Sequence, residues 1–378
     1  MVKRLKTLEN TVVLLSLGLL LTATPASAAP IKYHIQGLGD IAGGQTASRA
    51  FGVNDAGQVV GYSFSASGQE AFIWDAENGM QGLGDLAGGS FMSDARAINN
   101  AGTVVGRSQS AGGLQGFTWD SVNGLSGLSE LSGGGFNSMA FAINDSGVIA
   151  GRSDGPGNIT QAVRWDMSGQ IEGLGFLKDQ TFSEAWGINE DGEIVGQGTV
   201  NNGFASFIWS EEDGMRSLAD LPGGEFLSDA FDINNNRIVA GAGSSVQGRE
   251  AFRWTPGEPL EGLGELPGGA FFSAASAIND EGIIVGQSNG PGEVQAVLWD
   301  ENNELSALFP LIANPEDWVR LAVATDISET GLIVGWGINK FGQEEAFILS
   351  EVPLPPAAFL FGGALLLIRQ RRTAKTSR

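Results

Sequence analysis

Apolar and polar residues alternate along this chain in short runs and do not follow a helical period. In the stretch SDARAIN at 93–99, small residues occupy every second position from Ser93 to Ala97. Further runs at 103–108, 116–119 and 125–131 are equally short and are bounded by Gly, Asn, Asp or Ser, which predicts four β-strands. The pattern therefore predicts an all-β fold.

This unit of four strands recurs along almost the whole chain. Its clearest mark is the stretch INNAGTVVG, whose first Asn returns every 45 residues, at Asn54, Asn99, Asn144, Asn189, Asn234 and Asn279. A last copy, ISETGLIVG, has Ser328 in that place, 49 residues after Asn279. Four short strands in each of seven copies predict a seven-bladed β-propeller over residues 30–351.

The two ends of the repeats predict that the propeller is closed. Residues 31–38 match only the fourth strand of a unit, whereas residues 346–351 match the third strand of the last unit. We therefore expect the first strand to complete the last blade, which removes the open edges that invite aggregation. An open β-solenoid is the alternative, and it would need capping units at both ends.

Turn chemistry explains the recurring Asn and Gly. A connection of the form NxxG fits a type I turn followed by a Gly with positive φ, and the Asn side chain can bond to the backbone two residues on. Ser328 can do the same more weakly, so all seven positions are interpreted as structural turn residues. Arg237 stands where this Gly is expected, and we predict a positive φ at Asn236 or Arg237, or a loop shifted by one residue.

Large aromatic residues also recur at fixed places. The third run carries Trp in six copies, at Trp74, Trp119, Trp165, Trp209, Trp254 and Trp299, and this predicts packing between neighbouring units. A ring of Trp residues that stacks on a ligand is the alternative.

Composition removes several kinds of site. The chain of 378 residues has no Cys and a single His, His34, which excludes thiolate chemistry, disulfides and histidine-cluster metal sites. No catalytic residue, metal or cofactor is predicted. Residues 30–350 carry 13 basic and 41 acidic residues, a balance that repels phosphates, so no nucleic-acid partner is expected.

The N-terminus has the three parts of a secretory signal. Residues 1–28 begin with basic residues, continue with a short apolar core over 12–21, and end with the small residues Ala26 and Ala28. Cleavage by signal peptidase is expected before Ala29. A retained membrane anchor is the alternative.

The C-terminus, 352–378, has a proline motif, a short apolar stretch over 356–368 and a basic end. The residues that define it are Val352, Pro353, Leu354, Pro355, Arg369, Arg371 and Arg372. This order resembles the PEP-CTERM sorting signals in their VPLP-type variant. The resemblance implies transient anchoring in the inner membrane by a short hydrophobic transmembrane helix, processing by an exosortase, and release to the outer surface or extracellular matrix of a Gram-negative bacterium. A plain membrane anchor is the alternative, and removal of the anchor stays open.

The repeat itself resembles the HAF family of extracellular repeats. The order LGxLPGG, SxAxxINxxGxVVG and AFxW covers residues 37–350, and the His-Ala-Phe element appears as EAF at 70–72, 250–252 and 345–347. The resemblance implies an extracellular setting and says little about chemistry.

These observations predict a secreted or surface protein that is not an enzyme and that binds polysaccharide or protein in an exopolysaccharide or biofilm context. The expected binding face is built from the blade crossings and the loops between the second and third strands, opposite the Asn turns. A purely structural surface protein is one alternative. Ligand identity and oligomeric state stay open.

A glycoside-active propeller is the other alternative, and it needs two carboxylates in a central pocket. Asp94, Glu184 and Asp229 occupy one equivalent slot and are the candidates, with Arg96 as a neighbour to check. The stretch DINNNR at 232–237 resembles a calcium loop, but its ligand series is incomplete and a turn is the preferred interpretation.

Overall fold

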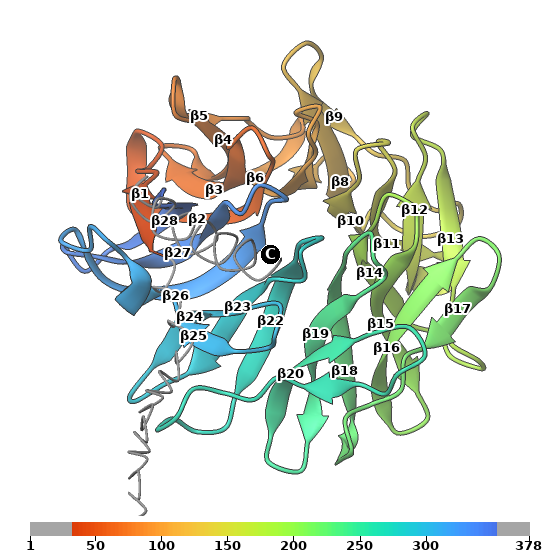
Figure 1. Cartoon of the computed structure of the whole chain (residues 1–378). Coiled ribbons are helices and arrows are strands. Elements are labelled where there is room, and N and C mark those ends of the chain that lie inside the picture. The colour runs from red at the N-terminus through yellow and green to blue at the C-terminus, as the bar shows by residue number, and fades with distance from the viewer. Residues whose placement is uncertain (1–31, 354–378) are drawn as a thin grey trace, which may run out of the picture. The chain divides into compact units, whose positions relative to one another are not determined.

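The computed structural model describes residues 32–353 (Figure 1). Within this range the chain forms strands β1 to β28 and two single-turn 3₁₀ helices, η1 (Pro156–Asn158) and η2 (Phe309–Leu311), with no α-helix, so the predicted all-β class is confirmed. The secretory signal and most of the sorting motif lie outside the described residues. No helix between residues 32 and 353 is long and apolar enough to cross a membrane.

Three sheets have four strands each, and two of them follow chain order. One consists of β10 (Ser138–Ile143), β11 (Ile149–Gly155), β12 (Ile159–Trp165) and β13 (Ile171–Gly175). The other consists of β22 (Ser273–Ile278), β23 (Ile284–Asn289), β24 (Val294–Trp299) and β25 (Leu305–Ala307). All neighbouring strands in them are antiparallel.

The third sheet joins the two ends of the described chain. Its order is β1 (Tyr33–Gly37), β28 (Glu344–Glu351), β27 (Ile333–Asn339) and β26 (Trp318–Ile327). Ile35 pairs with Leu349, and the N–H of Val352 donates to the carbonyl of Lys32 at 2.8 Å.

Two further sheets have eight strands, and each is a pair of four-stranded groups. The first contains β2 (Gly43–Val53), β3 (Val59–Ser65), β4 (Gly68–Asp75) and β5 (Gly79–Gly82), followed by β6 (Gly88–Ile98), β7 (Val104–Ser110), β8 (Gly113–Asp120) and β9 (Gly124–Gly127). The second contains β14 (Ser183–Ile188), β15 (Ile194–Val200), β16 (Gly203–Ser210) and β17 (Gly214–Ser217), followed by β18 (Gly223–Ile233), β19 (Val239–Ser245), β20 (Arg249–Trp254) and β21 (Glu261–Gly262). A single parallel pair links the halves, Gln69 with Met92 in the first sheet and Phe204 with Leu227 in the second.

The core lies between neighbouring groups. One cluster, for example, combines Val60 and Ile73 with Ile98 and Phe117 from the next group. Trp165 and Trp299 are fully buried, and each donates its indole N–H to a main-chain carbonyl of the preceding group. These Trp side chains therefore pack between units, as the sequence pattern predicts.

The NxxG turns form as expected, but the Asn side chain accepts the N–H four residues on, where a bond two residues on was predicted. In the first copy the N–H of Gly57 donates to the carbonyl of Asn54 at 3.0 Å, and the N–H of Gln58 donates to the Asn54 side chain at 3.0 Å. Arg237 has φ of 62°, which confirms the strained position predicted where the repeat lacks its Gly.

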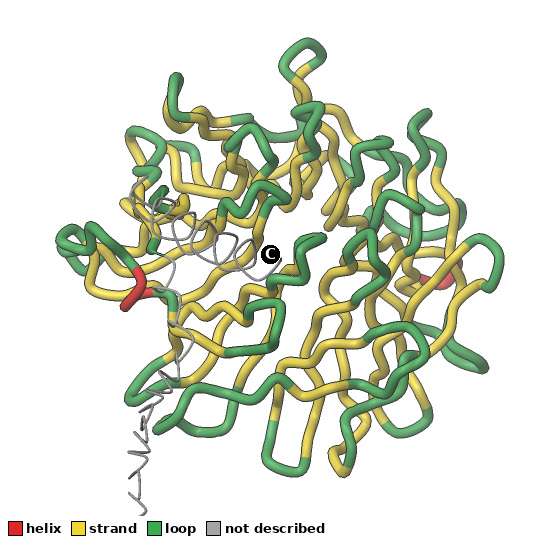
Figure 2. The backbone as a smooth tube through the Cα atoms, viewed as in Figure 1, coloured by secondary structure: helices red, strands yellow, loops and turns green. Residues whose placement is uncertain are grey.

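The first strand of each group lies innermost, against a central cavity, and the strands and loops that follow lie farther out (Figures 1 and 2). The residues that line this cavity come from β2, β6, β10, β14, β18, β22 and β26. The candidate site is therefore built from equivalent positions of the repeat.

Candidate functional site

The first strand of each group carries a β-bulge at the same place in the repeat. In β6, Ala95 pairs with Gly106 and Ala97 pairs with Val105, so Arg96 has no partner in the ladder. The same irregularity occurs in β2, β10, β14, β18, β22 and β26. A bulge breaks the alternation of a strand and re-aims the extra side chain.

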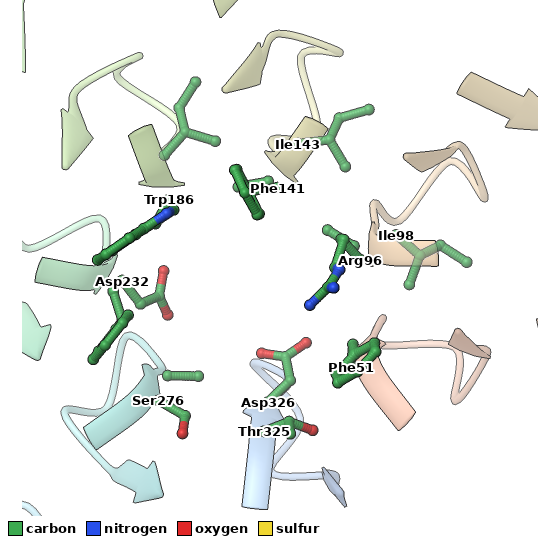
Figure 3. Close-up of a pocket in the computed structure, with 15 residues that line it drawn as sticks. Phe51, Arg96, Ile98, Phe141, Ile143, Trp186, Asp232, Ser276, Thr325 and Asp326 are labelled. Atoms are coloured by element: carbon green, nitrogen blue, oxygen red, sulfur yellow. The ribbon is translucent and has the colours of Figure 1, made fainter. Parts of the chain in front are cut away.

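The bulged residues all line the central cavity, which has a volume of about 420 Å³. They are Phe51, Arg96, Phe141, Trp186, Phe231, Ser276 and Thr325. Figure 3 shows Phe141, Arg96 and Thr325 around the same open space. The volume is typical of small-molecule sites. Because the residue before each bulge is always Ala while the bulged residue varies, a constant scaffold presents different side chains to one cavity.

Aromatic rings and one guanidinium form much of the wall. Trp186 and Phe231 stack with ring centroids 5.0 Å apart and an interplanar angle of 17°. The guanidinium carbon of Arg96 lies 4.5 Å from the ring centroid of Phe51. Stacked rings and a cation over a ring are surfaces that bind flat or partly apolar ligands.

Arg96 belongs to a cluster with a net positive charge. Its Nε donates to Asp94 Oδ1 at 2.6 Å, and the Nε of Arg107 donates to Asp94 Oδ2 at 2.7 Å. Asp94 is almost completely buried, so one carboxylate serves two guanidiniums and one positive charge is left over on this side of the cavity.

Two carboxylates also line the cavity, Asp232 across from Arg96 and Asp326 nearer to it (Figure 3). Asp232 and Asp326 directly follow the bulged residue in β18 and β26, where the remaining groups have only Gly or Ala. Figure 3 shows both side chains directed into the cavity. Each residue is half-buried, so part of its surface faces the cavity.

Each of these carboxylates also bridges neighbouring groups. Asp232 Oδ1 accepts the N–H of Ile233 at 2.8 Å, and Oδ2 accepts the N–H of Ile278 from the next group at 2.9 Å. Asp326 repeats the arrangement with Ile327 at 2.9 Å and Val53 at 2.8 Å. A carboxylate oxygen can accept two hydrogen bonds, so each oxygen retains capacity for a ligand.

The environment raises the pKa of both groups. Burial raises the pKa of Asp232 to about 7, and the charge of Asp326 adds to this, while the N–H donors of Ile278 and Ile233 oppose it. Burial also raises the pKa of Asp326 to about 6 against the N–H donors of Val53 and Ile327. Near neutral pH, Asp232 therefore holds its proton more readily than Asp326.

A second hollow adjoins the cavity at the Asn turns. It has a volume of about 190 Å³ and shares Ile98, Ile143, Ile188 and Asp232 with the lining of the cavity. Around it, five turn residues donate their side-chain Nδ2 to the carbonyl of the equivalent residue in the next group; these are Asn54, Asn99, Asn144, Asn189 and Asn234. The turn Asn residues thus connect groups as well as shaping their own loops.

The carboxylates singled out from the sequence lie elsewhere. Asp94 pairs with Arg96 and Arg107, Glu184 pairs with Arg152, and Asp229 pairs with Arg249. None of these three carboxylates lines the cavity. Strict alternation put Asp94 and Arg96 on one face, but the bulge at Arg96 directs only the arginine inward.

The stretch at 232–237 divides between two roles. Asp232 faces the cavity, whereas Asn234 and Arg237 close a turn through the N–H of Arg237 and the carbonyl of Asn234. Among the described residues, no three acidic or His side chains are grouped closely enough to hold a metal ion.

No family model matches the sequence, and no curated protein matches it at the sequence level. Solved structures do resemble it. A streptogramin B lyase structure has a TM-score of 0.52 at 10% identity, over 85% of this chain and 98% of the other. A puromycin hydrolase has a TM-score of 0.55 at 14% identity, over 78% of this chain and 50% of the other. The described residues have a β-propeller fold.

A gluconolactonase from Xanthomonas campestris also matches, at 11% identity over 87% of this chain and 97% of the other, with a TM-score of 0.43. At these identities the likeness shows the fold alone. The prediction that the protein is not an enzyme is contradicted, because solved structures with this fold include a lyase and a hydrolase. A rigid propeller scaffold gives no reason to exclude catalysis.

Proposed function

We propose that the protein is a closed, seven-bladed propeller that cleaves glycosidic bonds in its central cavity. The ring architecture is supported by the seven four-stranded groups and by the pairing of β1 with β28. The bonds from five of the six turn Asn residues to the next group follow the same order around the cavity.

The observation that carries the function is the pair Asp232 and Asp326 on one aromatic-lined cavity, with pKa values raised to about 7 and about 6. Glycoside hydrolysis uses one carboxylic acid and one carboxylate. Two carboxyl groups whose environments separate their pKa values are suited to divide these roles.

The roles follow from the order of the two pKa values. Asp232 holds its proton to the higher pH and donates it to the departing glycosidic oxygen. Asp326, ionised at lower pH, stabilises positive charge at the anomeric carbon or takes the proton of the attacking water. The stacked Trp186 and Phe231 supply an apolar surface for a sugar ring.

The proposed setting is the cell exterior. It is supported by the secretory pattern before Ala29 and by the sorting-signal pattern that begins at Val352. A polysaccharide of the extracellular matrix is the substrate class that is consistent with both this setting and the cavity.

The test is hydrolysis of a panel of chromogenic glycosides and of isolated exopolysaccharide by the full chain. Asp232→Asn and Asp326→Asn are each expected to lower kcat by about 10²-fold or more, since a positioned acid or base contributes that much. Ser276→Ala, which changes the same cavity without removing a carboxyl group, is the control and is expected to keep most of the activity.

The pH profile of kcat/KM should have limbs near pH 6 and pH 7, shifted in the Asn variants. If the wild-type chain cleaves no glycoside, or if both Asn variants keep full activity and fold normally by circular dichroism, the proposal is wrong.

A further inference from the structure

Main-chain N–H groups at equivalent positions around the cavity differ in whether a carboxylate side chain accepts them. Asp326 accepts the N–H of Val53 in the following group, and Asp232 accepts the N–H of Ile278 in the same way. The slot that these carboxylates fill is the residue directly after the bulge. In three consecutive groups this slot holds Gly52, Ala97 and Ala142, which have no acceptor to offer.

Three N–H groups therefore have no side-chain acceptor among the described residues. They belong to Ile98, Ile143 and Ile188, in β6, β10 and β14. In β6 the N–H of Asn99 bonds across the hairpin to the carbonyl of Thr103, so the N–H of Ile98, one residue earlier, points away from β7. The equivalent bonds of Asn144 and Asn189 give Ile143 and Ile188 the same orientation.

The main chain at these positions faces the cavity. Ile98 and Ile188 pack their side chains into the clusters between groups, yet all three residues line both the cavity and the adjoining hollow. In Figure 3 the side chains of Ile98 and Ile143 point away from the middle of the cavity. The wall here is therefore formed by backbone, with its donors toward the space.

Arg96 lines the same cavity. Its Nε is taken by Asp94, but its Nη groups make no hydrogen bond to any residue within 32–353. A guanidinium with free donors next to backbone N–H groups is an arrangement that holds carboxylates. Asp232 and Asp326, on other parts of the wall, have carboxylate oxygens that can accept hydrogen bonds from hydroxyl groups.

We infer that the cavity binds a sugar that carries a carboxylate, a uronic acid residue, with its carboxylate on Arg96 and the N–H groups of Ile98, Ile143 and Ile188. This inference names the substrate class of the glycosidase proposed above and rests on that proposal. The hydroxyl groups and the glycosidic oxygen then lie toward Asp232 and Asp326. A neutral sugar leaves these donors without a charged partner.

Binding of D-glucuronate and of D-glucose to the full chain tests the inference by calorimetry or ligand-observed NMR. Glucuronate is expected to bind at least about tenfold more tightly, the gain typical of charge-assisted hydrogen bonds. Arg96→Gln is expected to remove this preference. Arg107→Gln is the matched control, since Arg107 pairs with the same Asp94 but does not line the cavity.

A second pair of variants addresses the backbone donors without changing charge. Ala142→Asn places an amide oxygen where Asp326 holds one for Val53, and it is expected to occupy the N–H of Ile188 and weaken glucuronate binding several-fold. Ala277→Asn is the control, because the next N–H, that of Ile327, is already bonded to Asp326. Equal affinity for the two sugars, or equal effects of Arg96→Gln and Arg107→Gln, would overturn the inference.

The two proposals fail in different ways. If glucuronate binding depends on Arg96 but no glycoside is hydrolysed, the proposed enzymatic function is wrong and the inferred ligand is supported. If hydrolysis depends on Asp232 but Arg96→Gln changes it for neither uronic nor neutral substrates, the inferred ligand is wrong and the enzymatic function is supported.

Discussion

Asp232 and Asp326 show how one residue can hold a fold together and face a ligand at the same time. Each carboxylate accepts two backbone N–H groups and so joins the innermost strands of neighbouring groups. Burying an ionised carboxyl group is costly unless it is hydrogen-bonded, and these bonds offset only part of the cost, since both pKa values remain raised. Ionising these two cavity-lining carboxyl groups therefore costs free energy in the folded state.

This location predicts how stability depends on pH. The pKa of Asp232 is about 7 in the folded protein against 3.8 as the ordinary value, so between about pH 4 and pH 7 the folded state binds more protons than the unfolded state. Stability must then fall as pH rises through this window, by an order of a few kcal/mol from this group. Asp326, with a pKa of about 6, adds a fall between about pH 4 and pH 6.

Melting temperatures measured from pH 4 to pH 8 check this. In Asp232→Asn the fall is expected to be smaller than in the wild type, because Asn does not titrate, and Ser276→Ala is expected to keep the wild-type slope. A melting temperature that falls from pH 4 to pH 7 as steeply in Asp232→Asn as in the wild type would contradict the assignment.

At the level of single residues, the sequence shows which positions vary between the copies but not which way their side chains point. Asp232 and Asp326 stand where other copies have Gly or Ala, and the bulged position varies from Phe51 to Arg96 to Ser276. Period-2 alternation assigns the bulged position to a face shared with Asp94, and the position of Asp232 and Asp326 to the opposite face. Only the register shift between Ala95 and Ala97 shows that the bulged side chain turns to the cavity.

At the level of elements, the Asn turns are the most regular connection between groups. Asn144 accepts the N–H of Val148 at 2.9 Å within its own turn and donates to the carbonyl of Asn189 in the next group at 3.0 Å. Ser328 keeps the turn bond, to the N–H of Leu332 at 3.2 Å, but has no amide to donate onward. The two kinds of bond can therefore be separated by substitution.

Asn144→Ala is expected to lower the free energy of unfolding by about 1–3 kcal/mol, because it removes a buried donor and acceptor together. Asn144→Ser should cost less, since Ser can still accept the N–H of Val148. Ser328→Ala, which breaks only turn bonds, is expected to cost about 1 kcal/mol. Urea unfolding measures all three. An equal cost for Asn144→Ala and Asn144→Ser would show that the turn bond to Val148 contributes nothing, and an Asn144→Ser variant as stable as the wild type would show that the bond to Asn189 contributes nothing.

Strand positions were predictable because a repeat of 45 residues multiplies a weak signal. Each copy has the same order of a small-residue run, an NxxG turn, a Val-rich run and an aromatic run, and β6 to β9 follow this order closely. Irregularities inside a strand leave no such mark. A bulge is set by pairing with the neighbouring strand, and its sequence signature here is only the invariant Ala before a variable residue.

At the level of the whole molecule, the proposed ring depends on one strand pair between segments more than 300 residues apart in the sequence. β1 supplies only five residues, from Tyr33 to Gly37, and covers the edge that β28 would otherwise expose. His34 and Ser350 lie directly opposite each other in this pair, and both are exposed. Opposed residues of antiparallel strands have Cα atoms about 4.5–5.5 Å apart, within the range that a disulfide requires.

The chain has no native Cys, so His34→Cys combined with Ser350→Cys creates a single possible intramolecular bridge. If the ring is closed by β1, the oxidised double variant should form this bridge as a monomer and gain about 2–4 kcal/mol of stability over its reduced form, because the link constrains the unfolded chain. Thiol titration, gel mobility and melting with and without reductant measure this. The two single-Cys variants control for bridges between molecules. Free thiols in the oxidised, folded double variant would show that the two ends do not pair as β1 and β28, and the ring would then have to close in another way or stay open.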